Sequence, residues 1–349
     1  MINLSAARVV RVCTHQVGNR LRDEDLLLAD HPSALEPEAA DVFLQYLLSA
    51  FNPVETYQFG HPTSIALNEV YAVTGQLFAA GADDEAAFVS ISQDIARLLY
   101  EQAMHPKIRA GKLNVVWFED VLIEDEAFAA VGIFKSESEA PFLQMRDEGA
   151  ITHIHAERGF EIKGMDKGCI IVQTEAEDGY RCLVVDKRGT ETRYWVDDFL
   201  KVRPLSTSYN QTATAMTATR NFLARTLPQE FEVEKSEQIN LLNKSAEFFG
   251  KKETFKQAEF EEEVLQDDRL IESFRNFQES LVADPHATPF GDGFEISSAA
   301  YKKQSKIFKS VLKLDRNFHV YIHGDKDLIE RGVDAGGRKF YKLYYDQES

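Results

Sequence analysis

The densest positive charge in the sequence lies between Tyr301 and Arg316, where six cations accompany the single acidic residue Asp315. Closely spaced cations neutralise phosphate groups, so this segment is a candidate contact for nucleic acid. Its candidate residues are Lys302, Lys303, Lys306, Lys309, Lys313 and Arg316. The ordinary alternative is a solvated helix face whose lysines only keep the protein in solution.

The length of this basic ridge depends on the secondary structure of the segment. In one continuous helix, Lys302, Lys306, Lys309 and Lys313 stand at i, i+4, i+7 and i+11 and line one side. If the second half is a strand, Lys309 and Lys313 share a face with Ile307 and Val311, and the ridge is shorter. Both arrangements keep the positive charge local.

A second basic segment, Arg338 to Tyr345, combines cations with aromatic rings. In a strand, one face carries Arg338, Phe340, Lys342 and Tyr344, and the other carries Lys339, Tyr341, Leu343 and Tyr345. Rings interleaved with cations can stack on bases and follow a phosphate backbone, which adds Arg338, Lys339 and Lys342 to the candidate residues. The same rings are also common cross-strand packing pairs in any sheet, and we favour that interpretation for the rings.

The sequence patterns give little support for a metal site or a catalytic site. His153 and His155 share a face if their segment is extended, as do His319 and His323, but two ligands do not make a site. Asp325 and Asp327 follow the second pair closely and make a divalent site conceivable, although ordinary surface histidines are the favoured interpretation. Asp120 followed by Lys135 superficially resembles a metal-dependent nuclease pattern, yet the position of the second carboxylate holds Ile133. Nucleotide-binding and hydrolase motifs are absent. We therefore expect no enzyme, no catalytic residue, no metal and no cofactor.

Overall charge sets a strong constraint on any contact with nucleic acid. The 349 residues carry 39 Lys and Arg against 57 Asp and Glu, a formal charge of −18. Residues 1–205 account for −14 of this charge and residues 206–349 for −4. Because a negative field repels phosphate, only a local basic patch could bind DNA.

The remaining composition is that of a globular protein with about two domains. Three cysteines without CxxC spacing argue against a disulfide framework or a zinc ribbon, and no apolar run is long enough for a bilayer. We expect a cytoplasmic protein with no membrane contact.

The elements that must position these residues divide near Val202 to Asn210, giving an acidic α+β domain at 1–205 and a second domain at 206–349. The first domain begins with three helical patterns: one from Pro37, one capped by Thr63 or Ser64 that ends at Gly81, and one opened by Asp83 or Asp84. Alternating strand patterns and acidic turns follow; the expected strands are Leu113 to Ile123, Phe128 to Lys135, Cys169 to Gln173, Tyr180 to Val185 and Thr192 to Val196. The short connections predict a mainly antiparallel sheet with the helices on one side.

The second domain is predicted to be helical, with a small C-terminal α/β element and the basic segment. Its expected helices are Ala213 to Leu227, Ser236 to Phe249 and a third starting at Asp267. Two strand-like runs, Arg316 to His323 and Arg338 to Tyr345, flank a helix-like insert from Asp325 to Arg331. The long apolar and charged region Ser236 to Val282 is a candidate homodimer contact.

Three segments carry a resemblance to a known family. The tail NFHVYIHGDKDLIERGVDAGGRKFYKLYYDQ resembles the C-terminal segment of bacterial nucleoid-associated proteins of the 37-kDa family, in its Bacteroidetes-type branch. LNVVWFEDVLIEDEAFAAVGIFKSE is similar to the family's central strand pair, and YWVDDFLKVRPLSTSYNQTATAM to the stretch leading into its second half. Together they cover about a third of the chain, in the family's order.

The resemblance implies a cytoplasmic protein that associates with the nucleoid, binds DNA with little sequence preference and, in some members, contacts a type II topoisomerase. It supplies no catalytic residues. Direct binding through the C-terminal cations would be weak and sensitive to salt. The alternative is an adaptor that docks on a DNA-bound protein through its acidic N-terminal half, without touching DNA.

Overall fold

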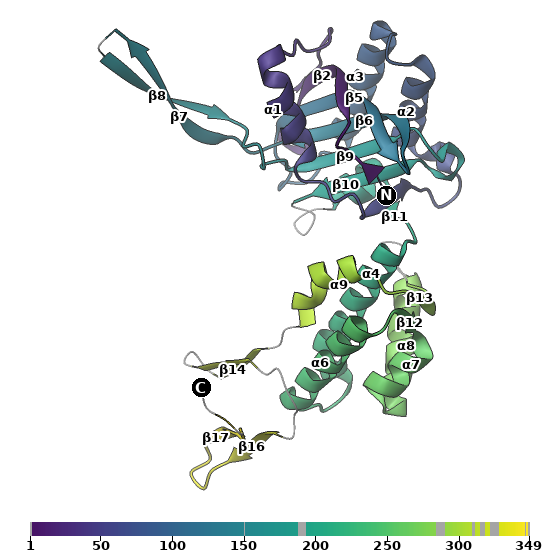
Figure 1. Ribbon diagram of the computed structural model, residues 1–349, viewed down its shortest axis with the longest axis vertical. Helices are drawn as coiled ribbons and strands as arrows, with labels where there is room; N and C mark the ends of the chain where they lie inside the picture. Colours follow the sequence, from purple (N-terminus) through teal and green to yellow (C-terminus); the bar gives the residue numbers. More distant parts are fainter. Residues whose placement is uncertain are drawn as a thin grey trace. The chain divides into compact units, whose positions relative to one another are not determined.

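The computed structural model describes residues 2–349 except 150, 188–192, 284–289, 309–310, 315–317, 322–327, 346 and 348–349; the side chains of 283, 311–313, 319 and 321 also lie outside the description. The chain forms two compact units, Met1–Leu205 and Ser206–Ser349 (Figure 1). The fold is α+β, as predicted from the alternation of strand and helix patterns.

A nine-stranded antiparallel sheet forms the centre of the first unit, in the order β11-β4-β10-β9-β6-β5-β2-β3, with β1 paired to β5. Its longest strands, β5 and β6, are joined at Glu124 and Asp125, both with positive φ. This pair of left-handed residues is the tight hairpin turn expected of the acidic cluster there. The strands are β1 (Ile2–Asn3), β2 (Arg8–Val17), β3 (Leu26–Leu27), β4 (Thr56–Phe59), β5 (Gly111–Ile123), β6 (Glu126–Ser136), β9 (Lys167–Val172), β10 (Arg181–Asp186) and β11 (Val202–Pro204).

Helices cover both faces of this sheet, so the prediction that they lie on one side is wrong. One core contains α2 (Glu69–Ala80), α3 (Glu85–Glu101) and Trp117 of the sheet. The other core, on the opposite face, contains α1 (Pro37–Leu48) and Phe118. Successive residues of a strand point to opposite faces of the sheet. In β5 the residues that point to each face are apolar, which is typical of a sheet buried on both sides.

Several local predictions for the first unit need correction. Asn68, rather than Thr63 or Ser64, caps α2 by accepting the Tyr71 N–H at 3.1 Å, whereas Asp84 caps α3 as one of the two expected residues. The N-terminal region also supplies the strand β2, which the helical interpretation missed. The segment Tyr194–Leu200 is a π-helical stretch, η4, in place of the expected strand; residue 192 lies outside the described part.

The second unit packs its helices around a core rich in phenylalanine. Rings of Phe222, Phe248, Phe249, Phe255 and Phe274 meet in this core, which explains why this part of the sequence forms compact helices in spite of its high charge. Its elements are α4 (Ser208–Asn221), η5 (Phe222–Thr226), α5 (Leu227–Glu230), α6 (Lys235–Lys251), β12 (Thr254–Lys256), α7 (Gln257–Phe260), η6 (Glu261–Leu265), α8 (Asp268–Ala283), β13 (Gly293–Glu295), α9 (Ser298–Gln304) and η7 (Ser305–Phe308).

The remaining strands of the described chain form separate two-stranded hairpins. In the second unit, β14 (Val311–Leu314) pairs with β15 (Phe318–Tyr321), and β16 (Ile329–Val333) pairs with β17 (Lys339–Leu343). The prediction of a helix-like insert from Asp325 to Arg331 is therefore wrong for the part that the structure describes, because Ile329–Arg331 belong to a strand. In the first unit, β7 (Ala140–Glu148) and β8 (Ile151–Gly159) form a separate ribbon that extends away from the large sheet (Figure 1).

Candidate functional site

The basic segment that begins at Tyr301 is divided between three elements. The Ser297 hydroxyl accepts the Ala300 N–H and caps α9, which ends at Gln304 before the 3-10 turn η7. The strand β14 then begins at Val311. A continuous helical ridge from Lys302 to Lys313 is therefore wrong, and the shorter arrangement holds because the β-branched and apolar residues after Lys309 pair with β15.

The lysines at the start of the segment are exposed. The Lys303 ammonium lies 6.0 Å from the ring of Tyr209. Among the residues that the structure describes, Lys302 and Lys306 have no carboxylate within ion-pair distance. Lys309 and Arg316 lie outside the described residues, as does the side chain of Lys313. Lys302 and Lys306 therefore keep their positive charge uncompensated by this part of the chain.

The hairpin β16–β17 presents a mixed face of cations, carboxylates and rings. The Arg338 guanidinium pairs with Asp334 at 3.0 Å, and the Lys342 ammonium lies 3.6 Å from Glu330. The Tyr344 hydroxyl donates to Glu330 at 2.6 Å. The neighbouring Tyr344 and Glu330 raise the pKa of Lys342, which stays charged at neutral pH. Two of the predicted phosphate contacts are thus already compensated within the hairpin.

Two other cations of this hairpin remain available to an anion. Lys339 is exposed, and so is Arg331, which the sequence interpretation did not single out. Neither makes an ion pair with the described part of the chain. The sequence patterns placed Arg331 in a helix-like insert and gave no signal for it; the strand register of the structure places it opposite Tyr341.

Rings and cations lie together on this hairpin as the alternation predicted, but only some of the rings pack inward. Tyr341 lies against Ile239 of α6, whereas Phe340 is 40% and Tyr344 45% exposed. The Phe340 ring lies flat on Gly332, where a Cβ would come within 2.3 Å of the ring. An exposed ring of this kind is available for stacking.

Packing on α6 fixes where the two basic segments lie within the second unit. Residues of both C-terminal hairpins, Leu314, Val320, Ile329 and Tyr341, pack around Ile239 near the start of the helix. Tyr301 of α9 lies against Gly250 near its end. These two positions are separated by about 16 Å along a helix that rises 1.5 Å per residue. The cations therefore form two groups along α6 and not one continuous patch.

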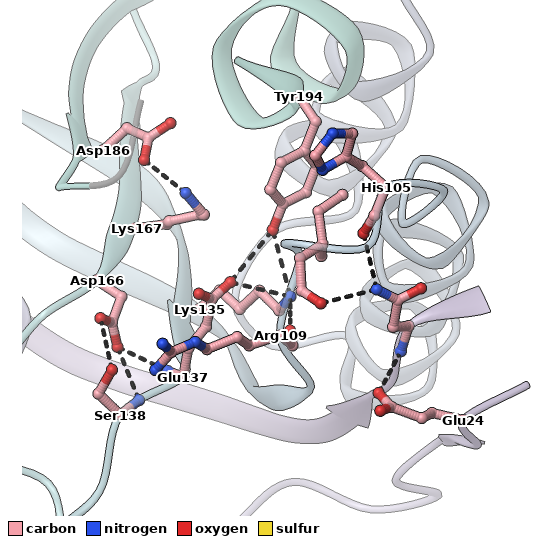
Figure 2. A network of polar contacts seen from close by, with 12 residues as sticks. Glu24, His105, Arg109, Lys135, Glu137, Ser138, Asp166, Lys167, Asp186 and Tyr194 are labelled. Atoms are coloured by element: carbon pink, nitrogen blue, oxygen red, sulfur yellow. Dashed lines mark hydrogen bonds and ion pairs between the residues drawn. The ribbon is translucent and has the colours of Figure 1, made fainter. Parts of the chain in front are cut away.

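A buried polar network in the first unit was missed from the sequence (Figure 2). The Lys135 ammonium donates to the Arg109 carbonyl at 2.6 Å and the Tyr194 hydroxyl at 3.2 Å, and pairs with Glu137 at 3.2 Å. Next to it, Lys167 pairs with Asp186 at 2.5 Å. The side chains of Lys135 and Glu137 are 0% and 2% exposed.

This network clamps neighbouring elements together, and the side chains of its two ion pairs are almost fully buried. Burial lowers the pKa of Lys135, an effect that the Glu137 carboxylate opposes. Burial, together with the nearby carboxylates, raises the pKa of the Tyr194 phenol far above its usual range. A sequence signal did exist, because Lys135 and Lys167 stand at the ends of apolar strands with a carboxylate nearby.

The nuclease and metal patterns considered from the sequence do not assemble. Lys135 is opposite Leu113 in the strand register, and Asp120 lies about 20 Å further along β5. Asp120 pairs instead with Arg8 at 2.8 Å. His153 and His155 do share a face of β8, with ring centroids 6.2 Å apart, but the described residues contain no group of three metal-ligating side chains. His323, Asp325 and Asp327 lie outside the description.

Comparison with known proteins gives the family. In the described residues, no helix is long and apolar enough to span a bilayer. No curated protein matches the chain significantly. Residues 14–346 match the family described as nucleoid-associated protein YejK, which covers both units. The branch within the family stays a prediction. Because the match extends over nearly the whole sequence, the chain belongs to the family of nucleoid-associated proteins.

Proposed function

We propose that this nucleoid-associated protein binds duplex DNA directly, with little sequence preference, through the cations of its second unit. The binding residues lie on α9, η7 and the hairpin β16–β17: Lys302, Lys303, Lys306, Arg331 and Lys339, with Lys309, Lys313, Arg316, Arg338 and Lys342 as further candidates. The observation that carries the proposal is the packing on α6: both C-terminal hairpins pack around Ile239 and Tyr301 of α9 lies against Gly250, so the two basic groups lie along one helix.

The charge of the hairpin supports contact with phosphate. Residues 328–345 contain four basic and two acidic side chains, whereas the whole protein has a charge of −18. Counterions are released only where cations meet phosphates, so a local excess of this kind can bind at low salt. Exposed Phe340 and Tyr344 lie on the face of Arg338 and Lys342, opposite to that of Arg331 and Lys339, and add a surface on which an unpaired base can stack.

The proposal predicts a modest dependence on salt. Lys302, Lys306, Arg331 and Lys339 are exposed and make no ion pair with the described residues. About four phosphate contacts correspond to a slope of about −4 in log K against log salt concentration. Contacts of this kind fix position without reading sequence, which agrees with binding of low specificity.

Charge reversal of three lysines tests the proposal. The variant K302E/K306E/K339E should lose the shift of duplex DNA at ~50 mM salt, and each lost contact should flatten the slope by about one. Its melting temperature should stay unchanged because these side chains are exposed. The matched control K107E/K112E/K163E reverses three exposed lysines of the first unit and should bind like the wild type. Equal loss in both variants would refute the assignment of binding to the second unit.

An adaptor remains the second candidate because of the acidic surplus of the first unit. Residues 1–205 carry 33 acidic against 19 basic side chains, a surface suited to a basic protein partner. In this alternative, the protein reaches the nucleoid by docking on a DNA-bound protein such as a type II topoisomerase. The purified chain alone would leave DNA unshifted even at ~50 mM salt. A shift that appears only after the topoisomerase is added would favour the adaptor.

A further inference from the structure

The ribbon β7–β8 has an amphipathic design. Its register pairs Ala140 with Gly159 at the base and Glu148 with Ile151 at the tip, and the ribbon pairs with no strand of the large sheet. An isolated two-stranded ribbon is only marginally stable in water, so a ribbon of this length needs a surface against which to pack.

One face of the ribbon is apolar over its central part. Paired residues of antiparallel strands point to the same side, so Leu143 with Ala156 and Met145 with Ile154 form a continuous strip. Leu143 is 66%, Met145 65% and Ile154 62% exposed. The opposite face is polar in its centre, with Gln144, Arg146, His153, His155 and Glu157, and carries the separate apolar residues Phe142 near the base and Ile151 at the tip. A contiguous exposed strip of large aliphatic side chains marks an interaction surface.

The charged residues at the two ends of the apolar face indicate what kind of partner could cover it. On the apolar face, Arg158 stands at the base and Asp147 at the tip. Within the chain, Arg158 lies 3.4 Å from Glu139, and Asp147 accepts the Thr152 hydroxyl at 2.8 Å. Residues 140–159 contain three acidic and two basic side chains, so the ribbon has no excess of cations for nucleic acid.

A second copy of the chain fits this pattern. When two such faces pack with the ribbons running in opposite directions, the tip of each meets the base of the other. Asp147 of one copy then approaches Arg158 of the second copy, and the two aliphatic strips cover each other. With the ribbons running in the same direction, like charges meet at both ends. A two-fold axis generates the first arrangement from a single self-complementary surface.

We propose that β7–β8 is a dimerisation arm, which packs its apolar face against the same face of a second copy in the antiparallel orientation. The region Ser236 to Val282, the contact suggested by the sequence, is less suited. Its large apolar residues, such as Leu242, Phe249 and Phe274, are buried in the core of the second unit. A dimer would also join two DNA-binding units in one assembly and raise their combined affinity.

Two isoleucines of β8 provide a matched test in the full-length protein. Ile154 (62% exposed) lies on the apolar face and Ile151 (63% exposed) on the opposite one. In sedimentation velocity, the wild type should be a dimer, I154E should raise the dimer dissociation constant by about tenfold or more, and I151E should leave it unchanged. Both variants should keep the melting temperature of the single chain because both side chains are exposed within it.

Exchange of the end charges tests the orientation. D147R and R158D should each weaken the dimer, and the double variant D147R/R158D should restore it, because the pair across the interface is re-formed with opposite signs. A wild type that remains monomeric at high concentration would overturn the proposal, as would equal effects of I154E and I151E. A monomer whose DNA shift is lost in I154E would assign the strip to nucleic acid instead.

Discussion

Replacement of Lys135 by methionine tests the buried network of the first unit. Methionine keeps the length of the apolar stem and removes the ammonium group. The Glu137 carboxylate, whose side chain is 2% exposed, then retains only the Tyr194 hydroxyl at 3.3 Å as a donor among its described contacts. The Arg109 carbonyl also loses its 2.6 Å hydrogen bond.

The expected loss of stability is large because one partner of a buried ion pair is removed. Leaving the other charge buried costs about 3 to 5 kcal/mol, while removing both charges together is often nearly neutral. K135M should therefore lower the free energy of unfolding by about 3 to 5 kcal/mol, and K135M/E137Q should recover most of this loss. The side-chain amide of the double variant keeps an oxygen that accepts the Tyr194 hydroxyl proton.

Urea unfolding followed by tryptophan fluorescence measures this effect in the relevant unit. Both tryptophans of the chain, Trp117 and Trp195, are buried in the first unit. Lys112 on β5 is exposed, so K112M is the control and should change stability by less than about 0.5 kcal/mol. A loss below about 1 kcal/mol in K135M, or a double variant no more stable than the single one, would show that the pair is not a buried clamp.

Further predictions concern other buried positions of the first unit. Burial lowers the pKa of His15 to about 4, below its ordinary 6.5, so the folded state loses about 3 kcal/mol of stability as pH falls from 6.5 to 4; H15N should flatten this acid limb in pH-dependent urea titrations. N68A removes the α2 cap and a 2.9 Å bond to the Leu200 carbonyl, so calorimetry should show a loss of about 2 to 3 kcal/mol. G132A places a methyl group within 2.2 Å of the Phe134 ring in a full core and should cost about 1 to 3 kcal/mol by chemical denaturation, whereas an unchanged midpoint would mean that the ring can move aside.

Much of the fold could be predicted from short-range patterns. The helix opened by Asp84 and the hairpin turn at Glu124 and Asp125 are both local features, because a cap or a left-handed turn is specified by adjacent residues. The strand β2 was missed because its alternation is interrupted by polar residues such as Thr14 and His15, whose hydrogen-bond partners include Asn114 and Ser92, far away in sequence. Hydrogen-bonded pairing between strands about 100 residues apart leaves no signal in a short stretch of sequence.

The candidate site shows the same division. Spacing alone located the cations of the second unit, including Lys302, Lys306 and Lys339, and the alternation of rings and cations on β17. The register of the hairpin decided which cations have a carboxylate nearby; Lys342, for example, lies beside Glu330. Arg331 became a candidate for the same reason.

The sequence by itself determined the α+β class and the local excess of positive charge near the C-terminus, because composition and short-range periodicity are properties of the chain alone. The family came from the resemblance of three segments and from the match over residues 14–346. Only the tertiary structure decided that the basic residues form two groups along α6, that Lys135 and Glu137 are buried together, and that β7–β8 has an uncovered apolar face. The physical reason is that burial and charge pairing are set by contacts between segments far apart in sequence. Their free energies depend on solvent exposure, which exists only after the chain has folded.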